Sequence, residues 1–294
     1  MTTGEVATPV VTTADPRQRR VARRLLKSPL AMAGFVVLSV AVVGAVFAPL
    51  IAPYGPSDAN FGDAFIPPGA EGYLLGTDSL GRDMFSRILY GTRASLIVGV
   101  LSVLLALAVG VPFGLLAGYF SPIDSVVSRL TDLVLAFPFL ILAVGLAAIR
   151  GPSLTNAAIA IGIVQVPAMV RVTRSETLRL KGRDYVASAI SDGAGDAWVL
   201  LRHILPNAIS AVIVQATIAI PGAILGEAVL SFLGLGIQPP APSLGTMLTE
   251  AQQYAAQAPW TAVMPGVAIM LLALAFNLFG DGLRDALDPK GGRR

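Results

Sequence analysis

The sequence predicts an all-α, polytopic membrane protein with six transmembrane helices, and two observations support this. The first is composition: 54% of the 294 residues are hydrophobic, only 13% are charged, and the mean hydropathy is +0.72. So few charges cannot solvate so much apolar surface on a soluble domain. The second is a set of six apolar stretches. Each is long enough to cross a bilayer as a helix, and none alternates like a β-barrel strand.

The first apolar stretch follows a basic N-terminal tail, residues 1–29. Met1 to Asp15 has no helical periodicity, and we expect it to be disordered. Leu30 to Ala52 contains no charged residue. As a helix it extends about 35 Å, enough to cross a hydrocarbon core of about 30 Å. The apolar core of a signal peptide is shorter, at roughly 7–15 residues, so we interpret this stretch as a retained transmembrane helix.

The other five apolar stretches follow in order along the chain. They are Ser95–Gly118, Leu130–Ile149, Leu154–Val170, Ala211–Leu233 and Thr261–Gly280. Proline interrupts several of them, for example at Pro112, Pro138, Pro167 and Pro221. Such interruptions suit a bundle that moves or lines a path, but proline and glycine are also commoner in membrane helices than in soluble ones. Both interpretations stay open at this point.

The distribution of cations predicts the orientation, because cytoplasmic loops are enriched in Lys and Arg. The cytoplasmic segments would hold Arg17, Arg19, Arg20, Arg23, Arg24, Lys27, Arg129, the cluster from Arg171 to Arg202, Arg284, Lys290, Arg293 and Arg294. The opposite side would keep only Arg82, Arg87, Arg93 and Arg150. Both termini, and the polar insert between the fourth and fifth apolar stretches, are therefore predicted to be cytoplasmic.

That insert, Arg171 to Asn207, is long, basic and helix-prone. We expect a short helical run from Asp184 to Trp198, interrupted at Gly193, before Pro206 begins the fifth helix. The small residues on one side of this run are Ala187, Ser188 and Ala189. The apolar side chains that we expect to be exposed are Tyr185, Val186, Ile190 and Trp198. Exposed apolar groups rimmed by charge mark an interaction surface, so the insert predicts a docking site for a soluble partner.

Four polar residues deep in the predicted helices are candidates for a path lining or for contacts between helices. Glu227 is the one acid well inside a stretch, and a charge at mid-membrane costs roughly 2.5–3.5 kcal/mol on insertion scales. It should therefore face the bundle interior, a partner or water, either lining a translocation path or holding the helix bend near Pro221. Gln165, Gln215 and Asn277 are amides at membrane depth, where interhelical hydrogen bonds are commoner than ligand contacts.

Several function classes lack the residues that they need. There is no cysteine and only one histidine, His203, so a thiolate or multi-histidine metal site is not expected. A phosphate-binding GxxxxGK[ST] loop is absent, as are the HExxH and GxSxG motifs of membrane proteases, so we expect no enzymatic activity. The cations lie at membrane edges rather than among stacking aromatics, which argues against nucleic-acid binding. An ion-coupled secondary transporter stays open as an alternative, with Glu227 as its one candidate coupling site.

Further motifs carry a resemblance to a known family. Ala187-Ser188-Ala189 through Gly193 to Ile204-Leu205-Pro206 resembles the EAA loop of ABC importer membrane subunits, with Ala187 where the family usually has Glu. The C-type permeases of the dipeptide/oligopeptide/nickel group are similar at further motifs, namely Gly76-Thr77-Asp78, Gly81-Arg82-Asp83, Glu227-Ala228, Gln238-Pro239-Pro240 and the run from Phe276 to Pro289. The resemblance covers about Leu30 to Pro289.

The resemblance implies a type I ABC importer transmembrane domain. Its parts would be the tail 1–29, the first helix and an extracytoplasmic loop at 30–92, the permease domain at 93–282 with the coupling loop 171–207, and a cytoplasmic tail at 283–294. In this family the coupling loop is seated in a groove of a cytoplasmic ATPase. The residues that this assigns to coupling are Asp184, Tyr185, Ala187, Ser188, Ala189, Gly193, Trp198, Ile204, Leu205 and Pro206.

The resemblance also implies partners and a location. The chain would pair with a second homologous permease in the cytoplasmic membrane of a prokaryote, and P-loop ATPase subunits would bind the ATP and Mg²⁺, leaving no cofactor in this chain. An extracytoplasmic solute-binding protein would deliver di- or oligopeptides, with nickel chelates or another small solute as the alternative. The segment from Gly76 to Arg93, which alternates acids and bases, would either receive that binding protein or pair with itself.

Overall fold

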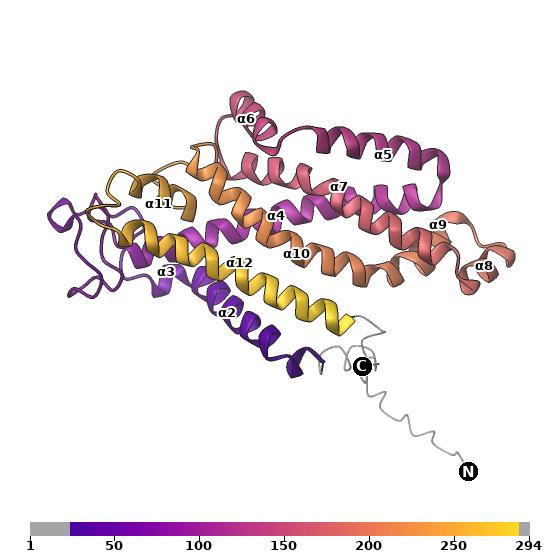
Figure 1. Ribbon diagram of the computed structural model, residues 1–294, viewed down its shortest axis with the longest axis horizontal. Coiled ribbons are helices and arrows are strands. Elements are labelled where there is room, and N and C mark those ends of the chain that lie inside the picture. Colours follow the sequence, from indigo (N-terminus) through magenta and orange to yellow (C-terminus); the bar gives the residue numbers. More distant parts are fainter. Residues whose placement is uncertain (1–23, 288–294) are drawn as a thin grey trace, which may run out of the picture.

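The computed structural model describes residues 24–287, and long helices lying side by side make up most of this range (Figure 1). Among these residues, five helical stretches are long and apolar enough to cross a membrane: α2 (Pro29–Val46), α4 (Met84–Tyr119), α7 (Leu154–Lys181), a stretch from Asp196 to Phe232 that contains α10 (Leu205–Phe232), and α12 (Trp260–Leu287). A bent pair, α5 (Ser121–Ala136) and α6 (Phe139–Arg150), is apolar enough to add a sixth crossing if the two helices are counted as one span. The predicted tail 1–15 and all of the basic cluster except Arg24 and Lys27 lie outside the described residues.

The third crossing differs from its prediction. We expected one helix from Leu130 to Ile149, but α5 and α6 are bent by 84° at the break between them. Phe137 has extended backbone (φ −87°, ψ 124°) and Pro138 follows it. Proline disfavours helical geometry in the residue before it, which explains why the helix stops there. This stretch therefore forms two helices with a sharp bend between them rather than one continuous helix.

The boundaries of the cytoplasmic segments also need correction. The fourth helix does not end at Val170, because α7 continues to Lys181 and takes up the first part of the predicted insert. An ion pair within this extension, from Arg179 Nε to Glu176 Oε2 at 2.9 Å, has the i, i+3 spacing that supports a helix. Likewise α12 continues to Leu287, so the start of the predicted tail 283–294 is helical.

A stripe of glycines lets α4 approach α7 closely. A Cβ atom added at Gly110, Gly114 or Gly118 would lie 2.6, 2.6 or 2.5 Å from the Cβ atoms of Met169, Thr173 and Thr177, respectively. Real Cβ atoms essentially never come so near a neighbour, so only glycine fits. Small residues four apart are how membrane helices bring their backbones together, because lipid offers no hydrophobic drive for association.

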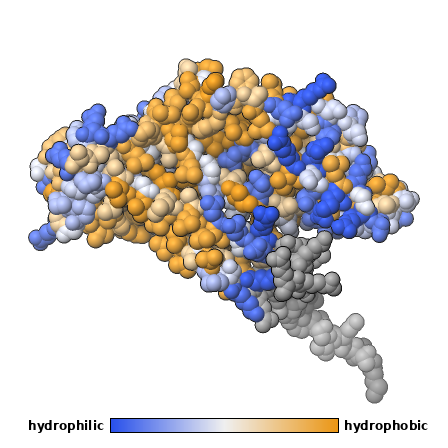
Figure 2. Space-filling view, viewed as in Figure 1, coloured by the Kyte–Doolittle hydropathy of each residue, from blue (hydrophilic) through white to orange (hydrophobic). Residues whose placement is uncertain are grey.

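The surface and the loops identify the two ends of the molecule. Figure 2 shows a hydrophobic band across the middle of this face and hydrophilic residues at both ends. One end carries α3 (Ala48–Ile51), the loop with η1 (Phe61–Asp63), and α11 (Leu244–Ala251); the opposite end carries α8 (Asp184–Ser191) and α9 (Asp196–Trp198) (Figure 1). The band matches a protein in a bilayer, and the predicted orientation makes the α8–α9 end cytoplasmic.

Candidate functional site

The cytoplasmic platform, defined here as residues 182–204, is built from short helical pieces. Helix α8 ends where Gly193 adopts a φ of +83°. Residues with a Cβ atom rarely adopt this backbone conformation, but glycine does so readily. The Ala194 N–H then donates to the Ala189 carbonyl at 3.0 Å, closing the end of the helix. After α9, a π-helical segment η2 (Val199–Ile204) leads directly into α10 at Leu205, with Pro206 in its first turn as predicted.

One face of the platform is buried against the bundle. Val186, Val199, Leu200 and Ile204 form a cluster with Leu115 and Tyr119 of α4 and Leu180 of α7. Val186 has 0% exposure, so its predicted role as an exposed apolar side chain is wrong. On a helix as short as α8, one apolar residue must face the body of the protein to hold the helix there, and Val186 is that residue.

The other face of the platform is exposed and partly apolar. Tyr185, Ile190 and Trp198 are 41%, 46% and 59% exposed, as expected from the sequence. Leu201, which the sequence analysis missed, is 63% exposed; its position three residues after Trp198 on one helical path was the available signal. The Arg202 guanidinium lies 5.9 Å from the centre of the Trp198 ring, so charge borders this apolar face.

The remaining predicted coupling residues belong to the same platform or its junction with α10. Asp184 is exposed in the first turn of α8, where a negative charge is favourable for the helix. Ala187 and Ser188 are exposed and Ala189 is half-buried. At the junction Ile204 is buried, Leu205 half-buried and Pro206 exposed. The structure therefore gathers all of the predicted coupling residues at one end of the molecule.

Glu227 is enclosed between helices rather than open to a path. Its exposure is 0%, and its Oε2 and Oε1 accept hydrogen bonds from Ser95 Oγ at 2.6 Å and from Ser231 Oγ at 2.7 Å. Ser231 Oγ in turn accepts from the Ile237 N–H at 3.2 Å. The carboxylate thus links α4 to the outer end of α10 and to the turn that follows it.

The three amides are not joined to this cluster. Gln165 Oε1 on α7 is buried without a hydrogen-bond partner among the described residues. Gln215 on α10 is half-buried and Asn277 on α12 is exposed, and within residues 24–287 neither side chain makes a hydrogen bond. The four predicted polar residues are therefore distributed over three helices rather than combined in one site.

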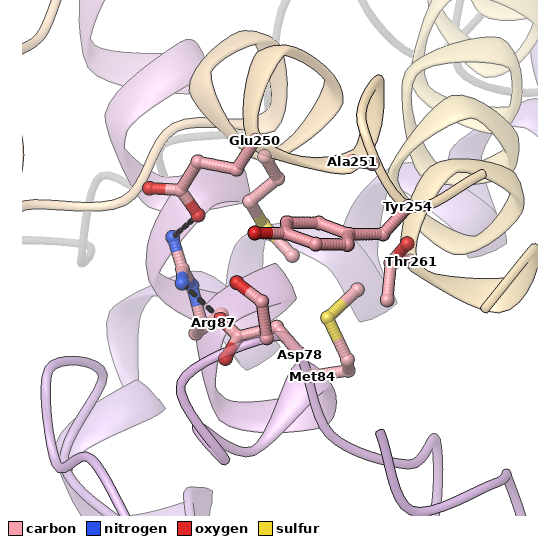
Figure 3. Close-up of a pocket in the computed structure, with 9 residues that line it drawn as sticks. Asp78, Met84, Arg87, Glu250, Ala251, Tyr254 and Thr261 are labelled. Atoms are coloured by element: carbon pink, nitrogen blue, oxygen red, sulfur yellow. Dashed lines mark hydrogen bonds and ion pairs between the residues drawn. The ribbon is translucent and has the colours of Figure 1, made fainter. Parts of the chain in front are cut away.

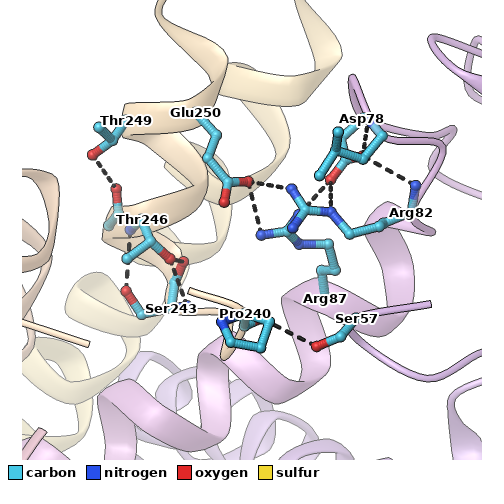
Figure 4. Close-up of polar contacts among 11 residues, drawn as sticks. Ser57, Asp78, Arg82, Arg87, Pro240, Ser243, Thr246, Thr249 and Glu250 are labelled. Atoms are coloured by element: carbon cyan, nitrogen blue, oxygen red, sulfur yellow. Dashed lines mark hydrogen bonds and ion pairs between the residues drawn. The ribbon is translucent and has the colours of Figure 1, made fainter. Parts of the chain in front are cut away.

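A second polar cluster lies at the extracytoplasmic end. Arg82 Nε is 2.7 Å from Asp78 Oδ2, and Glu250 Oε2 of α11 is 2.6 Å from Arg82 Nη2 and 2.9 Å from Arg87 Nη2 (Figure 4). Arg87 also pairs with Asp78. Two arginines and two acids balance in charge, which a buried cluster needs. The segment from Gly76 to Arg93 is thus paired with itself and with α11, a partner that no local sequence pattern indicated.

The cavity beside this cluster is too small for a substrate. Its volume is about 10 Å³, and its lining includes Arg87, Glu250, Tyr254 and Thr261 (Figure 3). That volume holds about one water molecule. Other bonds tie the same outer layer together, including Ser57 Oγ to the Pro240 carbonyl at 3.1 Å and Trp260 Nε1 to the Thr77 carbonyl at 3.0 Å. The cluster therefore fastens the outer loop to α4 and α11.

The apolar band, the crossing helices and the two polar ends define a multi-pass membrane protein. Residues 110–292 match the family described as binding-protein-dependent transport system inner membrane component, and residues 18–68 match the N-terminal TM domain of oligopeptide transport permease C. The chain belongs to this family of ABC importer permeases, which confirms the resemblance seen in its motifs. It is a multi-pass protein of the cytoplasmic membrane.

Named relatives cover nearly the whole chain. It is 44% identical over 279 residues to the dipeptide transport system permease protein DppC of Alkalihalophilus pseudofirmus, covering 95% of this chain and 91% of that one. It is 47% identical over 268 residues to the di/tripeptide transport system permease protein DppC of Pseudomonas aeruginosa, covering 88% of each. It is also 45% identical over 271 residues to the glutathione transport system permease protein GsiD of Pectobacterium atrosepticum, covering 91% and 89%.

A solved structure shares the fold. A chain of the inward-facing MetNI methionine ABC transporter superimposes with a TM-score of 0.58 at 20% identity, over 70% of this chain and 98% of that one. At this identity the likeness concerns the fold alone. It confirms the predicted architecture, the transmembrane domain of a type I ABC importer.

Proposed function

We propose that this permease carries peptides inward across the cytoplasmic membrane, together with a second homologous permease subunit. Peptides are the substrate class because relatives at 44–47% identity over most of the chain are named for dipeptide, di/tripeptide and glutathione transport. An extracytoplasmic binding protein selects and delivers the solute. Nickel chelates or another small solute are the alternative, since related systems can differ in that binding protein.

The energy enters through the cytoplasmic platform, where P-loop ATPase subunits dock. The observation that carries this assignment is the exposed apolar face of Tyr185, Ile190, Trp198 and Leu201 on a segment whose other face is packed against α4 and α7. An exposed apolar face on a firmly seated segment fits a protein groove rather than water. Binding of ATP closes the ATPase pair and displaces the platform, and the helices open outward to receive the peptide. Hydrolysis then returns them to the inward state.

The polar residues inside the bundle have a structural role in this proposal. Glu227 holds α4 against α10, since both carboxylate oxygens already accept serine hydroxyls. An ion-coupled mechanism is disfavoured, because it would need this carboxylate to be open to a coupling ion at the midplane.

Trp198→Asp tests the docking site. The whole complex is extracted in mild detergent, and the ATPase subunits that co-purify with this chain are quantified. We expect their recovery to fall at least about tenfold, because an aromatic residue at the centre of an interface contributes strongly. Phe61→Asp is the matched control: Phe61 is 73% exposed at the opposite end and should not change recovery. Equal ATPase recovery from Trp198→Asp and wild type would refute docking at this face.

The substrate is tested in liposomes that hold the complete complex and its binding protein. ATP should drive uptake of radiolabelled di- and tripeptides, and unlabelled peptides should compete. Uptake of a nickel chelate without uptake of peptide would replace the peptide assignment while leaving the docking site intact.

A further inference from the structure

Tyr119, the last residue of α4, lies where three elements meet at the cytoplasmic end. Its hydroxyl donates to Oδ1 of Asp196, the first residue of α9, at 2.8 Å. Its backbone carbonyl accepts a hydrogen bond from Nζ of Lys181, the last residue of α7, at 2.7 Å. The same ammonium lies 4.7 Å from the centre of the Tyr119 ring, a cation–π geometry. Tyr119 therefore connects its own helix, α4, with both α7 and the platform.

The side chain of Tyr119 is buried between α4 and the platform. Tyr119 is 7% exposed and packs in the cluster that contains Val186, Val199 and Leu200 of the platform. A buried tyrosine hydroxyl needs a hydrogen-bond partner, and the carboxylate of Asp196 supplies a charge-assisted one. Across the described part of the chain, this is the one side-chain hydrogen bond between α4 and residues 182–204. The platform is covalently continuous with α7 and α10, but α4 depends on this bond and on apolar packing.

At the joint where Tyr119 meets Lys181 and Asp196, α4 and α7 pack closely against each other. Gly118 lies one residue from Tyr119, and a Cβ there would be 2.5 Å from Thr177 Cβ, so the close contact of α4 with α7 extends to the joint itself. With Gly110 and Gly114, the contact continues toward the middle of the membrane. A force applied to Tyr119 through Asp196 would therefore act on two long helices that cannot easily slide apart.

We propose that Tyr119 is a positioning residue for energy coupling: through Asp196 and Lys181 it makes the α4–α7 pair follow the platform when the ATPases move. This inference rests on the proposed function, in which the ATPases dock on the platform. The proposal gives Tyr119 no direct contact with the ATPase, because Tyr119 is 7% exposed and packs on the buried face of the platform.

The experiment measures whether α4 and the platform stay together. The chain has no cysteine, so spin labels can be placed at cysteines introduced at Leu104 on α4 and at Asp192 on the platform, both exposed. The assembled complex is measured by pulsed electron resonance without nucleotide and with MgATP and vanadate. In the otherwise wild-type chain we expect one narrow distance distribution that nucleotide leaves unchanged. With Tyr119→Phe, which removes only the hydroxyl, nucleotide should produce a second distance.

Partner variants separate positioning from simple loss of structure. Asp196→Ala should behave like Tyr119→Phe, and the double variant should be no worse than either, because both changes remove the same bond. Asp196→Asn keeps an acceptor oxygen and should retain the narrow distribution. Tyr90→Phe is the control on the same helix: within the described residues the Tyr90 hydroxyl makes no hydrogen bond, and this variant should match wild type.

A transport measurement provides the functional result. Peptide carried per ATP hydrolysed, with labelled alanylalanine as the probe, should fall about tenfold in Tyr119→Phe while ATPase subunits stay bound, the scale expected for one charge-assisted hydrogen bond. If nucleotide leaves the distance distribution of Tyr119→Phe unchanged, the proposed positioning role of Tyr119 is wrong. Loss of bound ATPase in that variant would also overturn it, since Tyr119 would then only support the docking face. The docking proposal fails in a different measurement, namely if Trp198→Asp recovers as much ATPase as the wild type.

Discussion

Ser95 Oγ of α4 donates a 2.6 Å hydrogen bond to Glu227 Oε2 of α10, and neither side chain is exposed. We propose that this carboxylate at membrane depth joins helices rather than meeting a substrate. Buried acids in membrane helices invite a functional assignment by default. Here the partners of both carboxylate oxygens favour the structural role, and this can be tested directly.

Glu227→Ala should lower the free energy of unfolding by about 2–4 kcal/mol. The change leaves two serine hydroxyls without their acceptor, and it leaves a cavity beside them. Glu227→Gln keeps the shape and one acceptor, so it should stay near wild type in both stability and peptide selectivity. Thermal unfolding and peptide competition check the two variants. Normal stability with altered peptide selectivity in Glu227→Gln would instead place this residue on the path.

The ion-pair cluster at the outer end should be sensitive to loss of a single partner. Glu250→Ala leaves the buried Arg82 and Arg87 with one acid between them, and removing one partner of a buried pair typically costs about 3–5 kcal/mol. Limited proteolysis of the outer loop should accelerate as it detaches from α11. Glu71→Ala, an exposed acid on the same loop without an ion pair in the described chain, should show no change.

Gly114→Ala should weaken the contact between α4 and α7, because the new Cβ would lie 2.6 Å from Thr173 Cβ and 2.8 Å from the Val170 carbonyl oxygen. Overpacking of this kind costs about 1–3 kcal/mol. Gly145→Ala in α6 is the matched control, since its Cβ would meet nothing within 4 Å. Comparison of their melting temperatures decides the point, and equal values would mean that the helices can separate without cost.

Tyr73 in the outer loop should resist ionisation. Its hydroxyl donates to Asp63 Oδ2 at 2.8 Å, and this bond, with lesser effects of burial and of nearby charge, raises the pKa of Tyr73 from 10.0 to about 12. A raised pKa means that the folded loop favours the neutral phenol. Its contribution is therefore complete below pH 10 and is lost as the pH rises toward 12. Phenolate absorbance should include a component that titrates near pH 12, and Asp63→Asn should move that component back toward 10.

Local patterns in the sequence were sufficient for the membrane class, the approximate positions of the apolar helices and the location of the platform. Apolar stretches of spanning length need no tertiary information, because the bilayer itself is the solvent that they match. The platform was found because its polar, helix-forming residues stand between two apolar stretches. Pro138 marked an interruption, although the 84° bend it produces depends on how α5 and α6 pack on their neighbours.

The contacts between distant segments could be known only from the tertiary structure. Glu250 pairs with Arg82 across 168 positions, and no periodicity in the sequence points from one to the other. Val186 was expected to be exposed, yet the choice of which face of a short helix is buried depends on what it docks against. Tyr119 is an ordinary residue at a helix end until Asp196 and Lys181 are brought to it. The sequence by itself determined which segments enter the membrane, since that depends on each segment's own polarity; the tertiary structure decided which residues tie them together, since that depends on distances that chain order does not encode.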